Sequence, residues 1–181
     1  MFLVLGGCLA ARQDVEVPKE KLREYLSNPK ILHEGFCLLL TSADSYGIAH
    51  DKFLSAESKN ALRYEAFVLG ITQVRNLVPV GFERLVSGIR LHKSSEPQND
   101  TMIVRWCNAE FGFSREFKLV LTRIGKFQFW QIDLRREDLE AMQEPLLAWY
   151  RKQKDAANDQ RLVYPPGWKY AAIDACDCTR N

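Results

Sequence analysis

The sequence lacks most of the patterns that reveal a reaction. It contains only three histidines, no glycine-rich phosphate loop and no Gly-x-Ser-x-Gly nucleophile elbow. Its charge is nearly balanced, with 25 lysine and arginine residues against 23 aspartate and glutamate residues, and the two signs alternate along the chain. Nucleic-acid binding normally requires clustered positive charge, so we expect no nucleic-acid partner.

Long apolar runs are also missing. No run approaches the roughly 18 residues that a membrane-spanning helix needs, so only a lipid anchor could hold the chain at a membrane. The composition is otherwise that of an ordinary globular domain, because 46% of the 181 residues are hydrophobic and 27% are charged. Changes in composition divide the chain into a segment at 1–17, a single domain at 18–155 and a tail at 156–181.

The N-terminal segment joins a short apolar run to a polar stretch. Residues 5–8 read Leu-Gly-Gly-Cys, which resembles the lipobox of bacterial lipoproteins. In that family the cysteine is lipidated and the residues before it are removed. The resemblance implies a lipidated Cys8, and Leu9 after it implies the periplasmic face of the outer membrane. The alternative is a buried strand or helix at the start of a cytoplasmic protein.

Helical patterns fill the first part of the domain. A proline in the first turn starts a helix over 18–28, and Asn28-Pro29 repeats that start signal for a second helix, which Gly47 ends. After a short helical turn, Ser55 is predicted to cap a longer helix. The residues expected on its apolar face are Ala61, Tyr64, Val68 and Ile71.

An alternating apolar pattern follows and predicts four antiparallel strands in sequence order. The first strand is expected over 78–93, with Gly81 and Gly88 as bends or bulges. Residues 94–100 form a turn, and Ile124-Gly125 marks the hairpin between the last two strands. Large side chains occur on both faces of these strands, so both faces should be at least partly covered.

A last helix is predicted over 136–154. Pro145 should kink or break it, because proline removes a backbone hydrogen-bond donor. The apolar stripe of this helix consists of Leu139, Met142, Leu146 and Trp149. We expect the stripe to pack against the domain, and the alternative is that it docks a partner.

Helices followed by an antiparallel sheet indicate an α+β fold. We expect N-terminal helices packed on a curved four-stranded antiparallel sheet, followed by a C-terminal helix and tail. Residues 42–67 and 117–134 resemble the helical half and the closing hairpin of the nuclear transport factor 2-like superfamily. That resemblance covers about residues 30–134 and implies a strongly curved sheet that leaves a cone. Enzymes of the superfamily place Asp, His or Tyr in the mouth of the cone.

Few residues are candidates for chemistry. Tyr64, Trp106 and Phe129 could line a pocket in the cone, although aromatic residues at these spacings are more often core. The histidines lie in separate predicted elements, so we assign no catalytic residue. No Cys or His cluster has the ligand spacing of a metal site, and we predict neither a metal nor a cofactor.

Whether the cysteines form disulfides depends on the compartment. If Cys8 is lipidated, an even number remains in an oxidising environment, which favours disulfides. The four that remain are Cys37, Cys107, Cys176 and Cys178. The last two are one residue apart and could staple the tail to another part of the chain. Free thiols are the alternative.

Two classes of function are compatible with these patterns. The first is a non-enzymatic bacterial envelope lipoprotein that binds another protein, as an immunity protein against a secreted toxin or as an accessory of a secretion system. The alternative is a small-molecule carrier or a SnoaL-type enzyme that uses the cone as its pocket. A filled cone would favour the first class, and a deep cavity with a buried Asp–His contact would favour the second.

Overall fold

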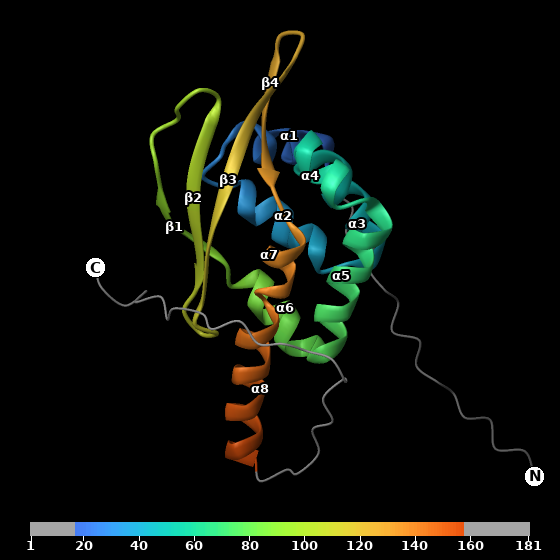
Figure 1. The fold of residues 1–181 in the computed structure, drawn as a ribbon, viewed down its shortest axis with the longest axis vertical. Helices are drawn as coiled ribbons and strands as arrows, with labels where there is room; N and C mark the ends of the chain where they lie inside the picture. The colour runs from blue at the N-terminus through green and yellow to red at the C-terminus, as the bar shows by residue number, and fades with distance from the viewer. Residues whose placement is uncertain (1–16, 158–181) are drawn as a thin grey trace, which may run out of the picture.

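The computed structural model describes residues 17–157, with side chains described as far as residue 154. It confirms the α+β class, because a series of helices is followed by a four-stranded antiparallel sheet and then by two more helices. In Figure 1 the sheet stands beside the helices, and the hairpin of its last two strands extends past them.

The first two helices are α1 (Lys19–Ser27) and α2 (Leu32–Leu40). Helix α1 follows Pro18 directly, as predicted. Helix α2 was predicted to begin at Pro29, and this was wrong. Asn28 forms a turn instead, because its side-chain Oδ1 accepts a hydrogen bond from the Lys30 backbone N–H at 3.0 Å. The helix begins only after that turn.

Short helical turns connect α2 to the next long helix. They are η1 (Ala43–Ser45), α3 (Tyr46–Ile48) and η2 (Ala49–Phe53). Gly47 therefore lies inside a helical turn and does not end α2, as had been predicted. Ser55 caps α4 (Ala56–Ala61) as expected, since its Oγ accepts a hydrogen bond from the Ser58 backbone N–H at 3.1 Å.

The predicted single helix after Ser55 is broken. Helix α4 ends at Ala61, and α5 (Tyr64–Leu77) starts three residues later. Ile71 is buried and Val68 packs against the core as predicted, whereas Ala61 is exposed, and α5 also buries Phe67 and Val74. Tyr64 was expected on the apolar face but is 45% exposed.

Helix α6 (Pro79–Ser87) occupies most of the segment that was predicted as the first strand. Pro79 stands in its first turn, where the fixed φ of proline suits a helix. Its buried residues, Phe82, Leu85 and Val86, follow a helical spacing. Strand β1 (Arg90–Ser94) is therefore short. Neither Gly81 nor Gly88 is a bend in a strand, since one lies within α6 and the other caps its C-terminal end.

The sheet has the predicted order β1-β2-β3-β4, with every neighbouring pair antiparallel. Its other strands are β2 (Thr101–Asn108), β3 (Phe113–Ile124) and β4 (Phe127–Asp133). A two-residue turn joins β3 to β4, as predicted. Gly125 adopts a φ of +59° there, which glycine tolerates without strain.

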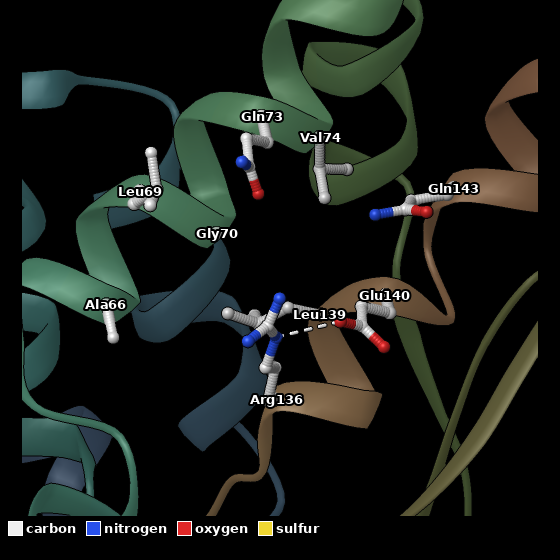
Figure 2. A pocket seen from close by; sticks show the side chains of 9 residues that line it. All are labelled: Ala66, Leu69, Gly70, Gln73, Val74, Arg136, Leu139, Glu140 and Gln143. Carbon is white, nitrogen blue, oxygen red and sulfur yellow. Dashed lines mark hydrogen bonds and ion pairs between the residues drawn. The ribbon is translucent and has the colours of Figure 1, made fainter. Parts of the chain in front are cut away.

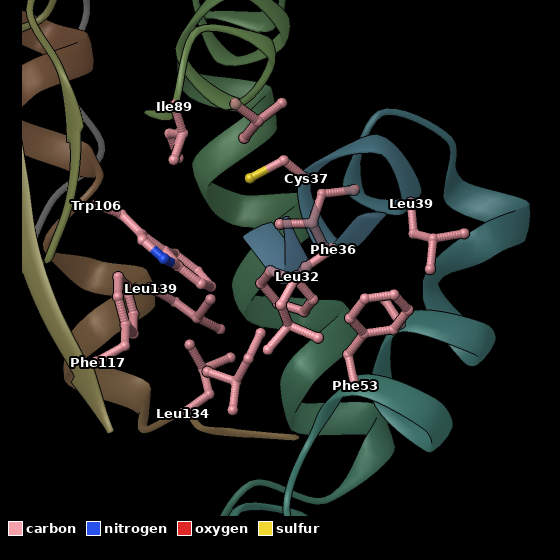
Figure 3. Close-up of a cluster of buried hydrophobic side chains, with 14 of the residues drawn as sticks. Leu32, Phe36, Cys37, Leu39, Phe53, Ile89, Trp106, Phe117, Leu134 and Leu139 are labelled. Carbon is pink, nitrogen blue, oxygen red and sulfur yellow. The ribbon is translucent and has the colours of Figure 1, made fainter. Parts of the chain in front are cut away.

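The core lies between the sheet and the helices. Trp106 stands near its centre, with its ring centroid 4.4 Å from that of Phe117 and 6.4 Å from that of Phe36. Figure 3 shows these rings pointing toward one another, with the side chain of Leu32 beside them. All four side chains are at most 2% exposed. The space enclosed by the sheet and helices at this level is therefore filled by side chains.

The last predicted helix consists of α7 (Arg136–Glu140) and α8 (Gln143–Ala157). The chain breaks just before Pro145, which takes a place in the first turn of α8. Leu139, Met142 and Leu146 are at most 2% exposed, and Trp149 is half-buried against the core. The stripe packs on the domain as predicted.

Candidate interaction face

The three aromatic residues predicted to line a pocket lie in different surroundings. Trp106 belongs to the core, and Tyr64 lies on the surface of α5 with its ring 5.6 Å from the His50 ring. Phe129 is half-buried on β4 and stacks on Phe127, with ring centroids 6.3 Å apart. The structure does not bring the three together around one cavity.

The histidines are also separate. His50 Nε2 lies 3.0 Å from the Leu62 carbonyl oxygen, and His92 is exposed on β1. His33 is 3% exposed, and within residues 17–157 neither of its ring nitrogens has a hydrogen-bond partner. Burial lowers the pKa of His33, which disfavours the charged ring. Within residues 17–157, no three His, Cys, Asp or Glu side chains are grouped so that they could hold a metal ion.

The two cysteines in the described segment are buried. Cys37 is a free thiol, so it is not bonded to Cys107, and burial raises its pKa to about 12. Cys107 donates a thiol hydrogen bond to Ser114 Oγ at 3.3 Å. Cys8, Cys176 and Cys178 lie outside the described residues. Lipidation and disulfides that involve the tail therefore stay predictions.

A buried hydroxyl network joins α4 to the end of β4. Ser58 Oγ accepts a hydrogen bond from the Leu134 backbone N–H at 2.7 Å and lies 3.1 Å from Asp133 Oδ1, to which it donates. Lys118 Nζ approaches the other carboxylate oxygen of Asp133 at 3.6 Å. Because Ser58 is only 1% exposed, a substrate could not reach this hydroxyl, and we assign the network a structural role.

A shallow depression separates α5 from α7 and α8 (Figure 2). Its volume is about 70 Å³. It is lined by Ala66, Leu69, Gly70, Gln73, Val74, Arg136, Leu139, Glu140 and Gln143. An ion pair between Arg136 Nε and Glu140 Oε1, at 2.8 Å, lies at its edge. Typical small-molecule sites measure about 300–1,000 Å³, so this depression is too small to enclose such a ligand.

The most distinctive surface lies on the β3–β4 hairpin, which projects beyond the helices in Figure 1. Ile124 stands opposite Phe127, and Thr122 stands opposite Phe129, so the four residues share one side. We call this set the hairpin face. Ile124 is 64% exposed and Phe127 is 46% exposed.

The apolar side of the hairpin changes along its length. Where the hairpin covers the helices, the buried pair is Leu119 with Ile132, on the side opposite the hairpin face. Toward the tip, that inner side carries the polar pair Arg123 and Gln128 instead. Toward the tip, Ile124 and Phe127 lie on the other side and stay largely exposed, whereas Phe129 packs against the core and Arg23 of α1 lies over the Phe127 ring.

The same side of the sheet is ionic farther from the tip. Lys118 pairs with Asp133 there, and Arg105 pairs with Glu116. The hairpin face is therefore a local apolar area and does not continue over the whole sheet.

Two cations border the hairpin face. The guanidinium of Arg23 lies over the Phe127 ring, 5.6 Å from its centroid, and Lys126 occupies the turn. Neither forms an ion pair with the residues that the structure describes. Arg123 pairs with Asp100 and lowers the pKa of that carboxyl. The electrostatic character next to the face is positive.

Comparison of the chain with protein-family models, curated proteins and solved structures gives no match. Across the described part of the chain, no helix has the length and apolar character needed to cross a bilayer. The hairpin face is therefore assigned from its own geometry and chemistry.

Proposed function

We propose that the chain is a non-enzymatic bacterial envelope lipoprotein that acts by binding another protein. The filled interior is the observation that carries this proposal. Trp106, Phe36 and Phe117 occupy the region between sheet and helices where the likeness to the nuclear transport factor 2-like superfamily implied a cone. A domain that packs its interior with aromatic rings and exposes others on a hairpin is better suited to bind a surface than to enclose a substrate.

The small-molecule alternative has less support. The depression beside α5 is shallow, and His33 and His50 each contact aromatic rings. Neither arrangement supplies the buried Asp–His contact that a SnoaL-type enzyme would need. Protein binding thus remains the better proposal.

The proposed anchor is a lipid on Cys8, with residues 11–17 as the tether to the domain. It would hold the domain at the periplasmic face of the outer membrane. Intact-mass measurement of the chain from its native cells tests this. We expect a chain that starts at a lipidated Cys8, and a Cys8→Ser variant should lose the added mass. A wild-type chain that retains Met1 and carries no lipid would contradict the anchor.

The two roles proposed within this class give different phenotypes. Cells that lack an immunity protein should be killed by neighbours that secrete the toxin, and restoring the gene should protect them. Cells that lack a secretion accessory should instead stop exporting the secreted protein. If deletion changes neither survival nor export, both roles are contradicted.

A further inference from the structure

We propose that the hairpin face binds a protein surface that offers an apolar patch edged by aspartate and glutamate side chains. This inference rests on the proposed function, because it assumes that the chain acts by binding a protein. It adds where the partner binds and what chemistry the partner presents.

Exposed apolar groups carry the first part of the argument. Ile124 and Phe127 are 64% and 46% exposed, although residues next to a hairpin turn are usually polar. The stacked pair Phe127 and Phe129 presents aromatic surface, and aromatic residues dominate the binding energy of protein interfaces. Toward the tip, the apolar residues change from the inner to the outer side of the hairpin, and Ile124 and Phe127 stay largely exposed there although Arg23 of α1 lies over the Phe127 ring.

The cations beside the hairpin face indicate which charges the partner presents. Arg23 and Lys126 lie beside the apolar groups, and neither forms an ion pair with a carboxylate of the described residues. An interface is most favourable when opposite potentials meet, so the partner should carry carboxylates at the edge of its apolar patch. A symmetric contact between two copies would bring these cations toward each other and would be repulsive.

The shape of the hairpin favours a protein over a bilayer. Gly125 and Lys126 form the turn, so the most projecting residues are small or charged. The apolar side chains lie along one flank, as pairs of facing residues on two strands. A flank of this kind matches an apolar patch on a protein surface, and the vesicle measurement below distinguishes it from a bilayer surface.

Site-specific cross-linking in the native cells tests the proposal. A photoreactive phenylalanine analogue replaces Phe127 in the full chain, and the control carries it at Val80, which is 67% exposed on α6. We expect position 127, and not position 80, to cross-link to a protein other than this chain. That protein is then identified and purified.

Binding of the purified protein is then compared among variants of the chain. Ile124→Thr with Phe127→Thr should weaken binding about tenfold or more, because the aromatic and aliphatic contacts are lost. Arg23→Glu with Lys126→Glu should weaken it by a similar factor and remove its sensitivity to salt. Ile103→Thr is the matched control, since Ile103 is 43% exposed on the same side of the sheet but outside the hairpin face. It should leave binding unchanged.

Several outcomes would overturn the inference. The first is that position 127 cross-links only to a second copy of this chain. The second is that the chain sediments with phosphatidylethanolamine–phosphatidylglycerol vesicles and that this requires Phe127. The third is that both double variants bind the partner with unchanged affinity. A protein cross-link from Val80 alone would refute the hairpin face but retain protein binding as the function. If neither position cross-links to a protein and intact complexes are also absent, the proposed function fails with it.

Discussion

His33 and Trp106 meet where α2 faces β2, with ring centroids 5.8 Å apart. Both ring nitrogens of His33 and the indole Nε1 of Trp106 are buried, and no described residue supplies a hydrogen-bond partner to any of them. Each such group costs roughly 1–3 kcal/mol of stability. The charged groups that act on His33 are Glu34, which favours protonation, and Arg90, which opposes it.

This burial predicts a loss of stability in acid. The folded state holds the pKa of His33 below its ordinary value of 6.5. Above that value the ring is neutral in both states, and below it the unfolded chain binds a proton that the folded chain resists. Stability is therefore complete at neutral pH and falls as the pH drops through this range. His33→Leu should reduce the difference in unfolding free energy between about pH 7.5 and about pH 5.

Urea unfolding at both pH values measures this effect. His92→Gln is the control, because His92 is exposed on β1, and it should keep the wild-type pH dependence. Equal pH dependence in His33→Leu and the wild type would show that His33 does not titrate in the way described.

Two glycines allow a test of how the helices pack. A Cβ at Gly35 would lie 2.5 Å from Tyr25 Cγ, so α1 could not keep its place on α2. Gly35→Ala should therefore cost about 1–3 kcal/mol in the free energy of unfolding. At Gly47 the nearest atom, the Tyr64 hydroxyl, is 3.9 Å away. Gly47→Ala should be neutral or slightly stabilising. Equal losses in the two variants would contradict the close contact between α1 and α2.

Trp149 packs α8 against the rest of the domain. Its ring stacks on Phe111 with centroids 5.2 Å apart, its Nε1 donates a hydrogen bond to Glu110 at 3.1 Å, and Arg84 lies over it. Trp149→Ala should cost about 3 kcal/mol, the lower end for a large aromatic residue because Trp149 is only half-buried. Val80→Ala, on the exposed side of α6, should change stability by less than about 0.5 kcal/mol. A thermal midpoint that Trp149→Ala leaves unchanged would point to a docking role for this helix instead.

Periodicity predicted the elements in which packing and local preference agree. Parts of β2 to β4 alternate between buried and more exposed residues, as at Phe117, Lys118 and Leu119, and the turn at Gly125 has the residue its backbone requires. Helix α6 was missed because Val80 and Val86 are β-branched, and because Gly81 and the capping Gly88 were interpreted as bends in a strand. The spacing of Phe82, Leu85 and Val86, together with Pro79, could have identified it.

At the scale of the whole molecule, the hairpin face could be predicted only in part. Phe129 was predicted to line a pocket and Ile124 to mark the hairpin turn, but neither of them, nor Phe127, was predicted to form a binding surface. Their exposure depends on where the helices stop beneath the hairpin, which is a tertiary property that no local pattern records. The one available signal was that both faces of β4 carry large apolar residues.

The same dependence on tertiary structure explains why the predicted pocket residues do not come together. Tyr64 stands at an apolar position of a helical pattern and Trp106 at one of an alternating pattern, but the break before α5 leaves Tyr64 exposed while the sheet buries Trp106. Whether the enclosed space is open or filled depends on side chains from α2 and β3 that are distant in sequence. The sequence alone could therefore pose the choice between a filled and an open cone without deciding it.

The central claim is that the hairpin face is apolar because it binds a partner protein, and not because it stabilises the fold. Urea unfolding of the Ile124→Thr/Phe127→Thr variant tests it most directly and requires no knowledge of the partner. A cross-strand pair, a cation–π contact and the stacking of Phe127 on Phe129 are lost, so the free energy of unfolding should fall by about 2 kcal/mol or less. Phe117→Ala, which empties a core position that is 2% exposed, should cost about 3–5 kcal/mol. A loss of that size in the hairpin variant would mean that the face belongs to the core and would contradict its role as a binding surface.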